Sequence, residues 1–249
     1  MVDVLNRNGF VANTVSASGV TKSLTSAVSD TITVDSEGLS KVASNPYTEL
    51  ANDFTQRITN LNKAFNIGSG TFAETWSSTL TKGMGEIDVL ATTLQSTTLT
   101  QTFNGENELS RQFETVAKMI KAKGSRGSDR DVFYVEHGGY DTHADLATFF
   151  NQLTTELNEG VDQFKKEMDY QGIWSDVTIV MVSEFSRTLT ENSGQGSDHA
   201  WAGNYFVAGG SVEGGRIIGQ FPERLQGGNM AFEPGILIVS NTSKDKSGL

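Results

Sequence analysis

The sequence predicts an α/β fold in which a mostly parallel sheet is sandwiched between helices. Three observations support this prediction: a short apolar run at residues 132–135, a long amphipathic pattern over residues 146–168, and a second apolar run at residues 177–182. A strand, a helix and a strand in this order, with a crossover of about forty residues, are typical of a βαβ unit. We therefore expect the two strands to belong to one largely parallel sheet.

The helix expected at residues 146–168 has the clearest pattern in the chain. Its apolar residues recur at spacings of three and four, which places them on one stripe of a helix. These residues are Leu146, Phe149, Phe150, Leu153, Leu157, Val161, Phe164 and Met168. Gly172 follows and is expected to close the segment.

The same periodicity predicts three helices upstream, over residues 46–65, 72–99 and 106–123. Gly83 and Gly85 predict a bend in the second of these helices. The third ends in Lys121 and Lys123, whose charges suit a helix carboxyl end, and Gly124 is the expected stop.

Residues 1–45 are rich in Ser, Thr and Gly, and we interpret them as a leader before a single α/β domain. That domain would span residues 46–249, with a helical part at 46–124 and a second part at 130–235. Short apolar alternations at 11–15 and 31–34 predict one or two strands in the leader, and a partly disordered leader is the alternative. Two more short strands are expected at 205–208 and 216–219.

The net charge of −11 argues against nucleic acids and anionic membrane surfaces as partners, because both attract Lys and Arg. The absence of cysteine excludes disulfides, thiolate zinc sites and a Cys nucleophile. No apolar run is long enough to predict a membrane span. Residues 1–13 do not have the pattern of a signal peptide, and the sequence leaves the compartment open.

The chain has three histidines, and each lies in or beside a polar cluster that follows a predicted strand. Ligands in open α/β sheets bind at the carboxyl ends of strands. Imidazole nitrogen and carboxylate oxygen bind Zn²⁺, whereas Mg²⁺, Mn²⁺ and Ca²⁺ prefer oxygen. A single histidine is more often a hydrogen-bonding residue than a ligand, but together with their acidic neighbours these histidines predict a divalent-metal site: His137, Asp141, His143, Glu184, Asp198 and His199.

Local spacing limits how these residues can share an ion. Asp141 and His143 are two positions apart, on a turn that Gly138 and Gly139 allow to bend sharply. Asp198 and His199 are adjacent, so in extended backbone their side chains point to opposite sides. Either one of that pair binds a given ion, or each serves a different ion.

Three strings of residues resemble the DUF1501 family in order and spacing: 138–143 (GGYDTH), 183–188 (SEFSRT) and 196–200 (GSDHA). The segment 209–219 is similar to that family too. The family is grouped with alkaline phosphatases, sulfatases and cofactor-independent phosphoglycerate mutases. The resemblance implies an alkaline-phosphatase-like sandwich with two metal sites at one edge of the sheet.

The resemblance also implies roles for individual residues. Asp141, His143 and His199 would hold one metal, and Glu184 lies where relatives place an acidic ligand of the second. Asp198 and His137 would be further ligands or partners that orient an imidazole. For Arg187 two readings stay open, bidentate binding of an oxyanion or a salt bridge to a neighbouring acid.

The sequence departs from the family's usual residues at four positions without changing a predicted ligand: Tyr140, Ser186, Ser197 and Ala200. A larger departure is that no hydrophobic front strand with a Gly- and Asp-containing loop is found. The resemblance therefore suggests an incomplete fold that is truncated at both ends, or a divergent member of the family. Ser16 and Ser18 are the only early candidates for the nucleophile, which stays unknown.

These observations lead to a metal-dependent hydrolase of phosphate or sulfate esters as the expected function. The alternative is a non-catalytic binding or assembly subunit, in which a protein partner covers the incomplete fold. A third reading is an α/β domain whose His and Asp residues only hydrogen-bond in loops. Members of the family are often exported, which is a hint about compartment and no more.

Overall fold

The computed structural model describes residues 2–24, 31–34, 57, 60, 70–200 and 203–219, and the backbone of 236–239. Of the helix predicted at 46–65, only Arg57 and Asn60 are described, and both are helical; the rest lies outside the described residues. The chain forms two compact units, Met1–Glu136 and His137–Leu249. None of the described helices is both long enough and apolar enough to cross a membrane.

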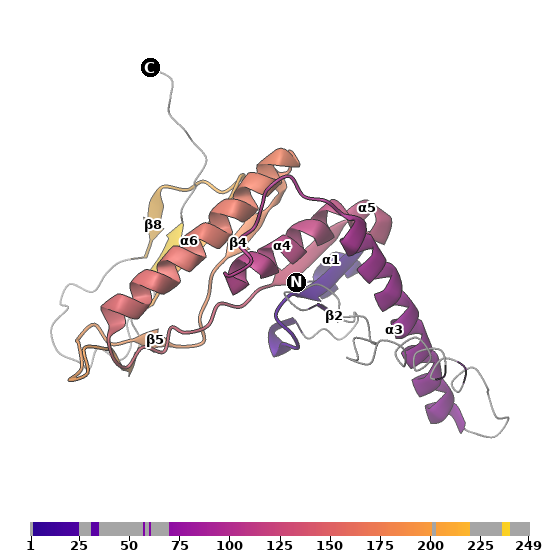
Figure 1. Ribbon diagram of the computed structural model, residues 1–249, viewed down its shortest axis with the longest axis horizontal. Coiled ribbons are helices and arrows are strands. Elements are labelled where there is room, and N and C mark those ends of the chain that lie inside the picture. The colour runs from indigo at the N-terminus through magenta and orange to yellow at the C-terminus, as the bar shows by residue number, and fades with distance from the viewer. Residues whose placement is uncertain are drawn as a thin grey trace, which may run out of the picture. The chain divides into compact units, whose positions relative to one another are not determined.

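The first unit contains a three-stranded parallel sheet in the order β2-β1-β3 (Figure 1). Its strands are β1 (Ala12–Ser16), β2 (Thr31–Thr33) and β3 (Arg130–Tyr134). The central residue Val15 pairs with Ile32 on one side and with Phe133 on the other. The strands predicted at 11–15, 31–34 and 132–135 are thereby confirmed, and so is the α/β class.

The strand predicted at 11–15, β1, occupies the centre of this sheet. β1 is a buried central strand, and it leads directly into Ala17, Ser18 and Gly19. Asn13, Thr14 and Ser16 are polar, so β1 is not a hydrophobic run, and residues 17–24 after it contain Gly19 but no Asp. The backbone groups of β1 are satisfied by ladders on both sides, which allows small polar side chains to be buried there.

The described residues from 70 to β3 form the helices α3 (Gly70–Ser96), α4 (Glu108–Lys121) and the short α5 (Lys123–Arg126). They follow α1 (Val2–Arg7) and the 3-10 turn Lys22–Leu24. α3 and α4 confirm the helices predicted at 72–99 and 106–123. α3 is one continuous helix through Gly83 (Figure 1).

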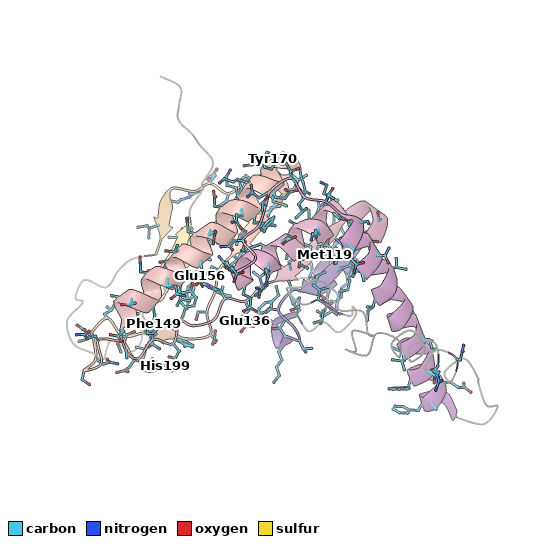
Figure 2. All side chains as sticks on the ribbon, in the orientation of Figure 1. Met119, Glu136, Phe149, Glu156, Tyr170 and His199 are labelled. Atoms are coloured by element: carbon cyan, nitrogen blue, oxygen red, sulfur yellow. The ribbon has the colours of Figure 1, made fainter. Side chains whose placement is uncertain are left out.

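The amphipathic face of α4 is buried. The side chain of Asn107 caps its first turn by accepting a hydrogen bond from the backbone N–H of Ser110. Leu109, Phe113 and Met119 are then directed into the interior, and Met119 is fully buried (Figure 2).

The stop predicted at Gly124 is wrong by three residues. After α4 ends, α5 adds one more turn, and Gly127 ends it in the left-handed conformation with φ of 62°. Arg126 explains the extension, because its guanidinium reaches the carbonyl of Met119 and forms a buried ion pair with Asp131 at 2.6 Å.

In the second unit, α6 (Leu146–Tyr170) confirms the helix predicted at 146–168. Phe164 and Met168 of the predicted stripe are buried, whereas Phe149 near the start of the helix is about half exposed (Figure 2). Gly172 follows with φ of 71°, a conformation that favours glycine.

The second unit has a four-stranded mixed sheet in the order β4-β7-β9-β8. β7 (Asn204–Gly209) is antiparallel to β4 (Thr178–Val180) and parallel to β9 (Ile236–Val239), which is antiparallel to β8 (Arg216–Ile218). The strands predicted at 177–182, 205–208 and 216–219 are confirmed.

The predicted βαβ unit is wrong, because β3 and β4 belong to different sheets and β4 pairs antiparallel with β7. Close backbone approach explains this pairing. A Cβ on Gly209 would lie 2.4 Å from the carbonyl oxygen of Val177, and one on Gly210 would lie 2.6 Å from that of Trp174. Because glycine has no side chain, the end of β7 packs directly on the backbone that precedes β4.

Candidate metal centre

A short antiparallel ladder brings together two of the segments that resemble the family, 183–188 and 196–200. β5 (Ser186–Arg187) pairs with β6 (His199–Ala200), so that Arg187 is directly opposite His199. The pairing extends to Thr188, whose backbone N–H donates to the carbonyl of Asp198 at 2.8 Å. Arg187 and His199 are thereby fixed side by side.

The third of these segments, 138–143, is held against the same ladder by the loop at 192–197. The backbone N–H of Ser197 donates to the carbonyl of Thr142 at 3.1 Å, and Ala144 forms an isolated bridge with Gln195. Gly196 lies so close that a Cβ there would be 2.1 Å from the carbonyl carbon of His143. Only glycine permits this approach.

The result is a convergence of three side chains on one point. Nε2 of His199 lies 2.7 Å from Oδ1 of Asp141, and Nε2 of His143 lies 3.0 Å from the same oxygen. One ligand atom from each of these residues lies within 4.8 Å of the others. All three side chains are about half exposed, with fractions of 52% for Asp141, 51% for His143 and 54% for His199. We call this group the His–Asp–His cluster.

The His–Asp–His cluster suits a divalent cation by the chemistry of its donor atoms. Two imidazole nitrogens and one carboxylate oxygen are the ligands that catalytic zinc sites use, and exposure leaves positions for water or substrate. Nδ1 of His143 lies 3.0 Å from Oδ1 of Asp198, an outer carboxylate contact typical of metal-binding histidines. The ring of His199 stacks on Phe185, with centroids 4.6 Å apart.

Asp198 is thus outside the cluster and contacts the ring nitrogen of His143 that faces away from Asp141. The resemblance left a ligand or an orienting role open for Asp198, and its role stays a prediction. The pKa of the Asp198 carboxyl is lowered, mainly by a hydrogen bond from Asn192 and then by the one with His143. Asn192 is a residue that sequence reasoning missed, since an Asn in a Gly/Ser loop usually signals only a turn.

Arg187 forms the salt bridge that was the alternative to oxyanion binding. Its Nη1 lies 2.5 Å from Oδ1 of Asp141, while Nε donates to the hydroxyl of Ser197 at 2.9 Å. Its Nη2 donates to the carbonyl of Ser197. The hydrogen bonds from His199 and, next, from Arg187 lower the pKa of Asp141.

His137 and Glu184 are not part of the His–Asp–His cluster. Nδ1 of His137 lies 3.0 Å from the hydroxyl of Tyr140, and Nε2 lies 3.1 Å from Oε2 of Glu156 on α6, so both ring nitrogens are engaged. Glu156, labelled in Figure 2, was missed because it lies 19 positions away. Glu184 is exposed two residues before β5.

The two serines considered as nucleophiles lie in the first unit. Ser16 is fully buried at the end of β1. Ser18 is partly exposed, and its hydroxyl donates to Oε2 of Glu136 at 3.3 Å. Gln112 holds the backbone of Glu136 through two hydrogen bonds. Ser18 is therefore the more accessible of the two candidates, and the nucleophile stays unknown.

Fold and site together define an α/β protein with an exposed His–Asp–His cluster whose donor atoms suit a divalent cation. The family model described as "Protein of unknown function (DUF1501)" matches residues 8–230, and the chain belongs to that family. The match includes β1 and every residue of the cluster. No curated protein and no solved structure matches the chain.

Proposed function

We propose that the protein is a divalent-metal-dependent hydrolase of phosphate or sulfate esters, with an alkaline-phosphatase-like arrangement of sheet and helices. The observation that carries the proposal is the convergence of Nε2 of His143, Nε2 of His199 and Oδ1 of Asp141. These three side chains come from segments up to 58 positions apart, and two loops are built around them. A purely structural polar cluster does not need two imidazoles directed at one exposed carboxylate.

A divalent cation held there would polarise an ester oxygen as a Lewis acid. The residues of the chain supply the rest of the site. Asp198 accepts the Nδ1 proton of His143, which leaves the Nε2 lone pair on the side of the cluster. Phe185 restricts rotation of the His199 ring by stacking.

Arg187 supports an anionic substrate. Its contacts with Asp141 and Ser197 use three of the five N–H donors of a guanidinium. The remaining donors, beside the cation, would suit the oxygens of a tetrahedral oxyanion. This local positive charge would be needed because the chain as a whole carries a net charge of −11.

The test is turnover of aryl phosphates and aryl sulfates by protein loaded in turn with Zn²⁺, Mg²⁺, Mn²⁺ and Ca²⁺. We expect metal-dependent hydrolysis that is lost in Asp141→Ala. Asp162→Ala is the matched control, because Asp162 is an acid on α6 that pairs with Lys166. Protein without bound metal, together with equal turnover by Asp141→Ala and the wild type, would exclude the proposal.

A non-catalytic assembly subunit is the second candidate, and the edges of the second sheet favour it. Among the described strands, β4 and β8 lie at the two edges, and Val180, Ile217 and Ile218 on them are exposed. Exposed apolar edge strands are surfaces on which another chain can add. Light scattering separates the candidates, since a stable monomer that hydrolyses ester contradicts the second one.

A further inference from the structure

The side chain of Asn192 joins the two loops of the metal centre. Its Nδ2 donates to Oδ1 of Asp198 at 3.0 Å and to the carbonyl oxygen of His143 at 3.1 Å. Its Oδ1 accepts hydrogen bonds from the backbone N–H groups of Gly194 at 2.9 Å and Gly196 at 3.0 Å. One partly buried amide thus makes four hydrogen bonds.

These contacts fix which end of the amide faces the metal centre. Two N–H donors surround the oxygen, and two acceptors surround the nitrogen, so a flipped amide would lose all four hydrogen bonds. The NH₂ group must therefore face Asp198 and His143. The loop that supplies the two N–H donors is itself locked by the close contact of Gly196 with the backbone of His143.

Asp198 needs such a support. Its side chain is 58% exposed, and an exposed carboxylate rotates freely unless hydrogen bonds hold it. Asn192 and His143 both contact its Oδ1, at 3.0 Å each. Asn192 therefore holds the same carboxylate oxygen that contacts Nδ1 of His143.

We propose that Asn192 is a positioning residue of the metal centre, which acts through Asp198 to orient the His143 imidazole with Nε2 toward the cation. This inference rests on the proposed metal site. Outer partners of metal-binding histidines change metal affinity by about 10–100-fold when they are replaced. Asn192 extends this chain by one residue, as Asn192–Asp198–His143.

The chemistry of the side chain explains why Asn serves here. Aspartate has the same shape and keeps the oxygen that accepts from Gly194 and Gly196. Its second oxygen, however, would face Oδ1 of Asp198 and the carbonyl of His143, where two donor contacts now exist. Asn192→Asp therefore keeps the loop bonds and removes the support of Asp198.

The experiment measures Zn²⁺ affinity by calorimetry and the absorption spectrum of Co²⁺ in the full chain. We expect Asn192→Asp to bind one metal per chain with affinity reduced by about tenfold or more and with an altered Co²⁺ spectrum. Ser193→Ala, in the exposed neighbour of Asn192, should leave both readouts unchanged. A merely structural role would lower the melting temperature without changing either readout.

A double-mutant cycle tests whether Asn192 acts through Asp198. Asn192→Ala in the Asp198→Ala background should cost no further metal affinity, and fully additive losses would overturn the inference. Unchanged affinity in Asn192→Asp would overturn it too. A wild type that binds no metal would contradict the proposed function itself. A wild type that binds metal, with unchanged affinity in the Asn192 variants, would contradict only the positioning role of Asn192. Asn192→Ala keeps the test available if Asn192→Asp does not fold.

Discussion

Nε2 of His199 lies 2.7 Å from Oδ1 of Asp141, although 58 positions separate the two residues in the chain. Two separate structural features produce this contact. They are the β5–β6 ladder and the packing of Gly196 on the backbone of His143. Both can be disturbed individually, so the contact can be tested from either side.

The three histidines should differ in their effect on metal binding. His143→Ala and His199→Ala should each abolish stoichiometric metal binding, because each removes one of three ligands. His137→Ala should keep one metal per chain, since its nitrogens contact Tyr140 and Glu156 instead. Elemental analysis of the three purified variants checks this, and equal losses in all three would contradict the assignment of His137.

Gly196→Ala should destabilise the second unit and weaken metal binding together. The new Cβ would lie 2.1 Å from the carbonyl carbon of His143, and overpacking of this kind costs about 1–3 kcal/mol. Gly138→Ala is the matched control, because a Cβ there meets no atom within 4 Å. Denaturant unfolding of both variants measures the difference, and equal stability would show that the two loops are not in contact as described.

The ion pair between Arg126 and Asp131 should be important for the first unit. Its side chains are only 9% and 6% exposed, and Ser128 donates a further hydrogen bond to Asp131. Asp131→Ala would leave a buried guanidinium unpaired and should cost about 3–5 kcal/mol of unfolding free energy.

The exposed pair of Lys118 and Glu114 provides the control for that prediction. It spans one helical turn at 2.7 Å, and Lys118→Ala should cost less than about 1 kcal/mol. Calorimetric or denaturant unfolding measures both variants. A cost for Asp131→Ala as small as that for Lys118→Ala would contradict a buried ion pair.

The hydrogen bonds at Glu156 should make stability depend on pH in a defined direction. Gln152 first, and then His137, lower the pKa of Glu156 from its ordinary value of 4.5. A carboxyl group whose pKa is lower in the folded than in the unfolded protein stabilises the fold at pH values above its unfolded pKa. This contribution is lost as the pH falls through the pKa of the folded protein.

Replacing Gln152 tests that direction. In Gln152→Ala the pKa of Glu156 should rise, and the variant should be less stable at pH 7 by less than about 1 kcal/mol. The difference should shrink as pH falls below 4.5. NMR titration of the Glu156 carboxyl and denaturation at several pH values measure both effects. An unchanged Glu156 pKa would refute the assignment.

Local patterns predicted the helices well, because the spacing of apolar residues is a property of the segment itself. α4 and α6 lie within a few residues of their expected bounds. Strand pairing depends on distant partners, so β4 could not be assigned to β7 from its apolar run. β1 was predicted from the short alternation at 11–15, but its central position in the sheet was not, because polar side chains occupy three of its five positions.

In the candidate site, too, residue type was predictable from the sequence, whereas the contacts between distant residues were not. Residue chemistry at strand ends identified Asp141, His143 and His199, which the structure brings together. The same reasoning placed His137 among the ligands, because residue type does not show which partner a histidine meets. Asn192 could not be found in this way, since its role follows from the path of the loop around it.

Anomalous scattering from a crystal grown with Zn²⁺ tests the central claim most directly. The account predicts one strong peak between Asp141, His143 and His199, at about 2.0–2.2 Å from their ligand atoms. A zinc-saturated crystal in which these side chains are ordered and no peak lies between them would contradict it.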